Sequence, residues 1–162
     1  MPAARDDLAT LTAWLGRVPD AGFEVCVRTP AGEPAVIRNA PLMSDGTPMP
    51  TRYWLVDPVL RAAVSRLESA GGVRAAEAAV DGDELAAAHA AYAAERDAAL
   101  PPGHAGPRPT GGVGGTARGV KCLHAHYAYF LAGGDDPVGR WVEERLAGGD
   151  DRVGPKTQGR LG

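Results

Sequence analysis

Gly111 to Leu131 reads GGVGGTARGVKCLHAHYAYFL, and in it a glycine-rich loop runs directly into an amphipathic segment. The stretch holds three of the six Cys and His residues of the chain. Val120, Leu123, Tyr127 and Phe130 recur at the helical period of about 3.6 residues. We therefore expect a core helix that begins near Val120 and packs against the other elements.

Three short segments ahead of this helix are typical of β-strands, at residues 23–29, 35–38 and 53–56. In the first, apolar and polar residues alternate, which places Phe23, Val25 and Val27 on one face of a sheet. Glu24, Cys26 and Arg28 are expected on the opposite face. Turn residues separate the segments, so an antiparallel arrangement follows.

Helical periods account for most of the remaining chain. A first helix carries Leu8, Leu11 and Leu15, and further helices are expected from Pro58, over residues 73–80 and 83–100, and from Pro137. The predicted fold class is α+β, with a small antiparallel sheet of about three strands packed against several helices. We expect one domain over residues 1–148 and a disordered tail over residues 149–162, which lack an apolar period.

Composition excludes several classes of protein. A formal net charge of −3 over 162 residues argues against a general nucleic-acid surface. No apolar run reaches the length of about 18 residues that a membrane helix needs, so no membrane insertion is expected. Two cysteines do not make a disulfide scaffold, and the start MPAARDDLATL is unlike a signal peptide. The expected location is cytoplasmic.

The glycine-rich loop suggests an anion site. Backbone N–H groups and the positive end of a helix dipole favour a phosphate-type ligand at such a place. Arg118, Gly119, Lys121 and His124 are the candidate contacts. The loop is not a nucleotide-binding P-loop, because Val120 stands where that motif requires lysine.

Cys122 and His126 suggest a second kind of chemistry, because residues four apart lie on one face of a helix. His124 would point away by about 200°, two steps of about 100° each. A zinc site would therefore need further ligands such as Asp57, and no spacing in the sequence favours one. The same pair could instead serve a hydrolase or transferase, with Cys122 as nucleophile and His126 as base.

The chain also resembles a bacterial family catalogued as domain of unknown function 501. The matching stretches are VRTP at 27–30, PAV at 34–36, PMPTRYWL at 48–55, SRLE at 65–68, VKCLH at 120–124 and DPVG at 136–139. The resemblance implies no established reaction. The family pattern has cysteine where this chain has Thr29 and Asp57, and this departure puts a shared metal site in doubt.

The leading hypothesis is a domain that binds a small anionic, phosphate-type ligand. Arg28 at the sheet edge is expected to converge with the start of the Val120 helix, and Thr51 completes the candidate contacts. The first alternative is the Cys122 and His126 enzyme, with or without a metal such as zinc. The second is an interaction protein whose 83–100 helix docks a partner. Genes of the family often lie beside one for a septum-formation initiator, and that association suggests a cell-division or envelope partner.

Overall fold

The computed structural model describes residues 5–20 and 22–148, so the expected disordered tail at 149–162 lies outside the described residues. Three strands form one antiparallel sheet in the order β1-β2-β3: β1 (Phe23–Arg28), β2 (Pro34–Asn39) and β3 (Tyr53–Leu55). The helices are α1 (Arg5–Leu15), α2 (Pro58–Ser69), α3 (Gly72–Ala79), α4 (Gly82–Ala98), α5 (Leu123–Leu131) and α6 (Pro137–Ala147), with a 3-10 turn η1 (Val113–Gly115). The predicted α+β class is confirmed.

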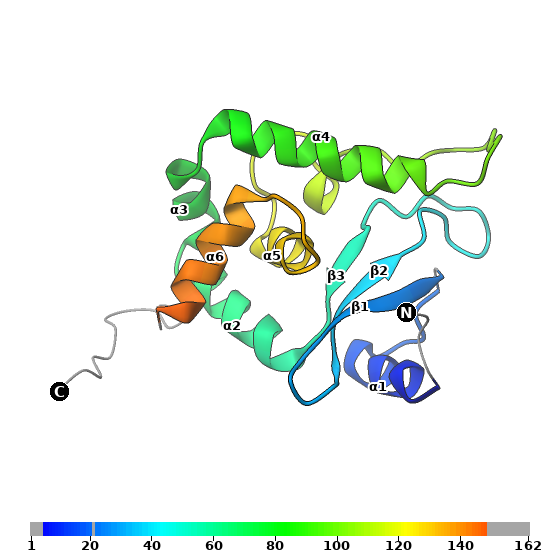
Figure 1. Cartoon of the computed structure of the whole chain (residues 1–162), viewed down its shortest axis with the longest axis horizontal. Helices are drawn as coiled ribbons and strands as arrows, with labels where there is room; N and C mark the ends of the chain where they lie inside the picture. Colours follow the sequence, from blue (N-terminus) through cyan, green and yellow to red (C-terminus); the bar gives the residue numbers. More distant parts are fainter. Residues whose placement is uncertain (1–4, 21, 149–162) are drawn as a thin grey trace.

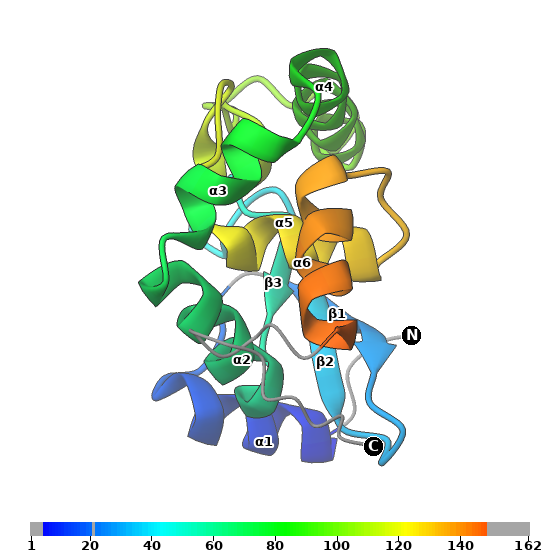
Figure 2. The ribbon, with the colours of Figure 1, turned by 90° about the vertical axis from the view of Figure 1, so that its left-hand side faces the viewer.

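The sheet separates two apolar clusters. The smaller cluster contains Leu11 of α1, with Val25, Ile37 and Val56. The larger cluster lies on the opposite face, where α4, α5 and α6 gather, as Figures 1 and 2 show. Neighbouring residues in a strand point to opposite faces, and Val36 accordingly belongs to the larger cluster.

Strand β1 departs from the alternation that its sequence predicts. The pairing with β2 shifts register between Val25 and Val27, which is a β-bulge at Cys26. Because of this irregularity, Cys26 and Val27 both pack against the larger cluster, while Phe23 and Val25 stay with α1. The prediction that Phe23, Val25 and Val27 share one face was therefore wrong.

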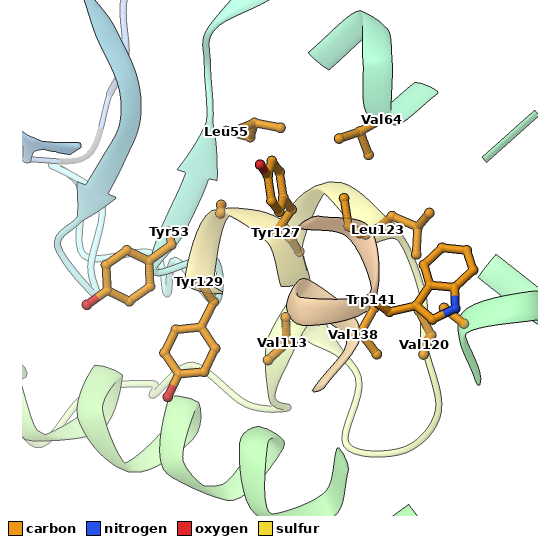
Figure 3. Close-up of a cluster of buried hydrophobic side chains, with 14 of the residues drawn as sticks. Tyr53, Leu55, Val64, Val113, Val120, Leu123, Tyr127, Tyr129, Val138 and Trp141 are labelled. Atoms are coloured by element: carbon orange, nitrogen blue, oxygen red, sulfur yellow. The ribbon is translucent and has the colours of Figure 1, made fainter. Parts of the chain in front are cut away.

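Helix α5 lies at the centre of the larger cluster (Figures 1 and 3). It contacts β3, α6, α2 and η1. Helix α5 carries apolar residues on several of its faces, because a neighbouring element covers each of these faces. Leu123, Tyr127 and Ala128 are all buried. The C-terminal half of the chain thus packs around the segment that begins at Cys122.

Aspartates cap α2 and α6, the two helices that the sequence starts at a proline. Asp57 accepts a hydrogen bond from the backbone N–H of Leu60 at 2.9 Å, and Asp136 accepts from Val138 and Gly139 at 2.9 and 3.1 Å. Pro58 and Pro137 follow as the first helical residues, where a missing N–H costs nothing.

The loop between α4 and α5 is anchored by Arg96, whose side chain is only 1% exposed. Its guanidinium donates to the backbone carbonyls of Pro50, Thr110 and Gly111, at 3.2, 3.3 and 2.9 Å. Val113 in η1 is fully buried. The glycine-rich segment is therefore held against the core. Across residues 5–20 and 22–148, no helix is long and apolar enough to span a bilayer.

Candidate functional site

Helix α5 begins at Leu123, three residues later than the sequence predicts, with Cys122 as its N-cap residue in an extended conformation. Carboxylates from two other helices accept hydrogen bonds from backbone N–H groups at the start of α5. Glu77 of α3 accepts from the N–H of Val120 at 2.7 Å, and Glu68 of α2 accepts from the N–H of Leu123 at 2.7 Å. Two backbone N–H groups in the region where we expected an external anion are thus bound to the chain's own carboxylates.

Gly119 makes this arrangement sterically feasible. It has φ = +64°, a conformation that favours glycine, and a Cβ there would lie 2.8 Å from Oε1 of Glu77. Its carbonyl accepts a hydrogen bond from Nε2 of His89 at 2.9 Å. Gly119 therefore shapes the loop. Its neighbouring groups contact Glu77 and His89 of the protein, in place of the external anion that we predicted there.

Four of the predicted site residues do come together, in a cavity of about 350 Å³ between β3 and the start of α5. We call it the Lys121 cavity. Its polar lining residues are Thr51, Lys121, Cys122 and His124, and its other lining residues are Tyr53, Trp54, Leu55, Gly114 and Ala125. Lys121 is exposed at its rim and has no acidic partner among the residues that the structure describes. This cavity is our candidate site.

His124 is held by contacts within the protein. Its Nδ1 lies 3.1 Å from a carboxylate oxygen of Glu68, and its Nε2 lies 3.2 Å from the hydroxyl of Ser65 and 3.3 Å from the backbone carbonyl of Arg61. Both ring nitrogens are thereby used, so His124 forms a positioned wall of the cavity. The sequence predicts His124 as a contact of the anion, but in the structure both of its ring nitrogens face groups of the protein.

A second cavity of about 400 Å³ adjoins the first, and none of the residues predicted for the site except His124 lines it. We call it the Arg61 cavity. It is lined by Trp54, Leu55, Pro58, Arg61, Ala62, Ser65 and His124. The SRLE stretch at 65–68, which carries part of the family resemblance, could have pointed here, because Ser65 and Glu68 of α2 hold His124.

Arg28 and Arg118 do not line the Lys121 cavity. Arg28 makes a two-pronged ion pair with Asp7 of α1, at 3.0 and 2.7 Å, and also donates to the carbonyl of Gly32 at 2.9 Å. The carboxylate of Asp7 raises the pKa of Arg28. Arg118 is exposed on the loop. The predicted convergence of Arg28 with the start of α5 was wrong, because α1 supplies a closer anion.

The Cys122 and His126 pairing is also not formed, because Cys122 precedes the helix and the regular spacing does not apply to it. His126 is fully buried, and its Nδ1 lies 2.7 Å from a carboxylate oxygen of Asp136. Burial raises the pKa of Cys122, although the backbone N–H groups of Ala125 and His124 oppose that effect. A thiol with a raised pKa and no adjacent base is a poor nucleophile.

The candidate metal ligands lie in different places. Asp57 caps α2, His126 is bound to Asp136, and Cys122 lines the Lys121 cavity. Within the described residues, no three His, Cys, Asp or Glu side chains form a group suited to a metal ion. Cys26 and Cys122 are free thiols.

Comparison with known families gives one match. Residues 25–144 match the family described as Protein of unknown function (DUF501). No curated protein and no solved structure matches the chain. The matched region includes all of β2, β3, α2 to α5 and both cavities. Because it spans well over half of the sequence, the chain belongs to the DUF501 family.

Proposed function

We propose that this chain binds a small anionic ligand of the phosphate type in the Lys121 cavity. The observation that carries the proposal is the position of Lys121 at the rim of a cavity, without an acidic partner among the described residues. A cavity of about 350 Å³ lies within the range of about 300–1,000 Å³ usual for small-molecule sites.

The lining supports this class of ligand. Tyr53, Leu55 and Ala125 give mostly apolar walls, and such walls strengthen a charge interaction because they shield one side of a bound ligand from water. The Lys121 ammonium attracts a phosphate or carboxylate as a point charge, and the Thr51 hydroxyl can donate to one of its oxygens. Arg28, Arg118 and Gly119 take no part in this revised set.

Thermal unfolding in the presence of inorganic phosphate, adenosine monophosphate and acetate tests the proposal. A ligand at 100 times its Kd stabilises the native state by about 2.7 kcal/mol, which is readily seen as a rise in Tm. We expect a phosphate-bearing compound to raise the Tm of the natural protein. Lys121→Gln should lose most of the rise.

Arg74→Gln is the matched control, because Arg74 is an exposed cation on α3 that lines neither cavity. It removes the same unit of charge and should keep the full rise in Tm. Equal responses of the natural protein and Lys121→Gln would contradict the proposal, as would a lack of response to every phosphate-bearing compound.

The two alternatives gain less from the structure. For an enzyme, Cys122 and His124 share the cavity, but the nitrogens of His124 are bound to other groups. For a partner surface, α4 turns Leu85, His89, Tyr92 and Arg96 inward. Its outer face is largely alanine and carries no feature that selects a cell-division or envelope protein.

We also propose a cytoplasmic location. Two free thiols suit a reducing compartment, because oxidising compartments favour disulfides. Labelling of the intact cell with a membrane-impermeant thiol reagent tests this: Cys122 should react only after lysis.

A further inference from the structure

The Lys121 cavity and the Arg61 cavity lie side by side, because they share Trp54, Leu55 and His124 as lining residues. We call the two together the groove. The groove follows β3, which is the edge strand of the sheet, and continues beside the first two turns of α2. Together the two parts offer an elongated site.

Each of the two cavities has one cation in its lining. Lys121 lines the Lys121 cavity beside α5, and Arg61 of α2 lines the Arg61 cavity. The side chain of Arg61, like that of Lys121, has no acidic partner in residues 5–20 and 22–148. Two cations that line one cavity system without counter-ions repel each other less when an anion binds to each.

The nearby carboxylates are engaged elsewhere. Glu68 accepts from the N–H of Leu123 and faces Nδ1 of His124, while Asp57 accepts from the N–H of Leu60. These contacts direct both acids toward helix ends, so neither forms an ion pair with Arg61 or Lys121.

The middle of the groove has a different character. Trp54 and Leu55 line it from the strand, and the ring of His124 lines it from α5. Ser65 and the carbonyl of Arg61 hold that ring at 3.2 and 3.3 Å from its Nε2. An apolar or aromatic ligand body fits such walls, because they offer few groups that would need to be desolvated.

We propose that the groove holds an elongated organic ligand with an anionic group at each end, one at Lys121 and one at Arg61, and an apolar middle against Leu55 and the ring of His124. This inference rests on the proposed function for the Lys121 end only. Once the first anionic group is bound, the second is held at a high effective concentration beside its cation. A ligand with two anionic groups therefore binds more tightly than a ligand with one.

A series of linear alkane-α,ω-bisphosphonates, from two to ten carbons, tests the inference against the alkyl monophosphonates of the same lengths. Calorimetric titration of the natural protein should show one preferred bisphosphonate length. At that length the bisphosphonate should bind at least about tenfold more tightly than its monophosphonate partner, as expected for a linked second contact.

Three variants separate the two ends. Arg61→Gln should reduce the best bisphosphonate to the affinity of the monophosphonate and leave the monophosphonate unchanged, since the backbone carbonyl that holds His124 remains. Lys121→Gln should weaken both ligands. Arg74→Gln, outside the groove, should change neither.

The possible failures differ in meaning. If bisphosphonates and monophosphonates bind equally, or if Arg61→Gln leaves the preference intact, the two-ended ligand is wrong while the Lys121 site stands. If neither series binds, or Lys121→Gln binds both normally, the proposed function itself fails and the two-ended ligand fails with it.

Discussion

His89 is a neutral histidine built into the core. Its side chain is 4% exposed; Nδ1 accepts from the N–H of Val113 at 3.0 Å, and Nε2 donates to the carbonyl of Gly119 at 2.9 Å. Burial lowers the pKa of His89 below its ordinary value of 6.5, assisted by His126 and opposed by the Gly119 carbonyl and Asp136. The protonated form would lose the bond from Val113.

This pKa predicts that the protein loses stability in mild acid. The unfolded chain binds a proton at His89 near pH 6.5, whereas the folded chain binds it only at lower pH. The free energy of unfolding should therefore be constant above about pH 7.5 and fall below about pH 6.5, by up to about 1.4 kcal/mol per pH unit for one proton. Urea unfolding at several values between about pH 5.5 and pH 8 measures this, in a range where carboxylates stay ionised.

His89→Gln supplies the control, because glutamine keeps an amide for the Gly119 carbonyl and does not titrate. We expect it to be less stable than the natural protein at pH 8 but to have a flatter pH dependence. An unchanged slope in His89→Gln would show that another histidine carries the effect.

Single residues were predictable from the sequence where their role is local. The inward positions of Leu85, His89, Tyr92 and Arg96 follow from the helical period of α4. The partners of Arg96 could not be predicted in this way. They are the carbonyls of Pro50, Thr110 and Gly111, and the positions of these residues next to α4 depend on the paths of two loops distant in sequence. The buried contact of His126 with Asp136 also spans a turn between two helices.

At the scale of elements, the start of α5 depends on tertiary contacts that a local sequence pattern does not contain. The apolar period predicts a helix from Val120, but Glu68 and Glu77 bind the N–H groups of Leu123 and Val120. These carboxylates come from α2 and α3, more than 40 residues earlier, and fix an extended Cys122. The sequence predicts an external anion at this helix start, whereas in the structure the chain's own Glu68 and Glu77 occupy these N–H groups.

Glu68→Gln tests this internal anion. The amide can still accept from Leu123, but the charge-assisted part of the bond and the favourable interaction with the helix dipole are lost, which should cost about 1 kcal/mol. The same change removes a negative charge beside the groove, so phosphate should raise the Tm of Glu68→Gln by more than it raises that of the natural protein.

Glu84→Gln at the start of α4 is the matched control, since Glu84 pairs with the exposed Arg140 and lines neither cavity. A phosphate response that grows equally in both variants would indicate a general charge effect. A smaller response in Glu68→Gln would contradict the expectation that the negative charge of Glu68 opposes binding of a phosphate-type ligand.

In the sheet, strand β1 likewise departs from the pattern that its sequence predicts. Alternation correctly places Phe23 and Val25 on one face, but the bulge at Cys26 reassigns Val27 to the other. A bulge inserts a residue without a sequence signature here, and every position after it changes face. Arg28 consequently lies beside Asp7 on α1.

For the molecule as a whole, the sheet forms a partition with unequal sides. The larger cluster draws on α2 to α6, whereas the smaller one depends on α1 alone to cover Val25, Ile37 and Val56 (Figure 1). Helix α1 precedes the region that matches DUF501, residues 25–144. Trp54 packs against the smaller cluster and also lines both cavities, so α1 and the groove meet at this side chain.

Leu11 and Leu8 on α1 provide a test of this dependence within one helix. Leu11 is fully buried against the sheet, and Leu8, one turn earlier, is 40% exposed. Leu11→Ala should lower the free energy of unfolding by about 3 kcal/mol, because it removes buried methyl groups and leaves a cavity. Leu8→Ala should change it by no more than about 0.5 kcal/mol, as for other surface positions. Urea unfolding of the two variants measures both, and equal losses would mean that α1 does not cover the sheet as the structure shows. The loss at Leu11 alone would establish that the segment outside the family match is part of the folded core.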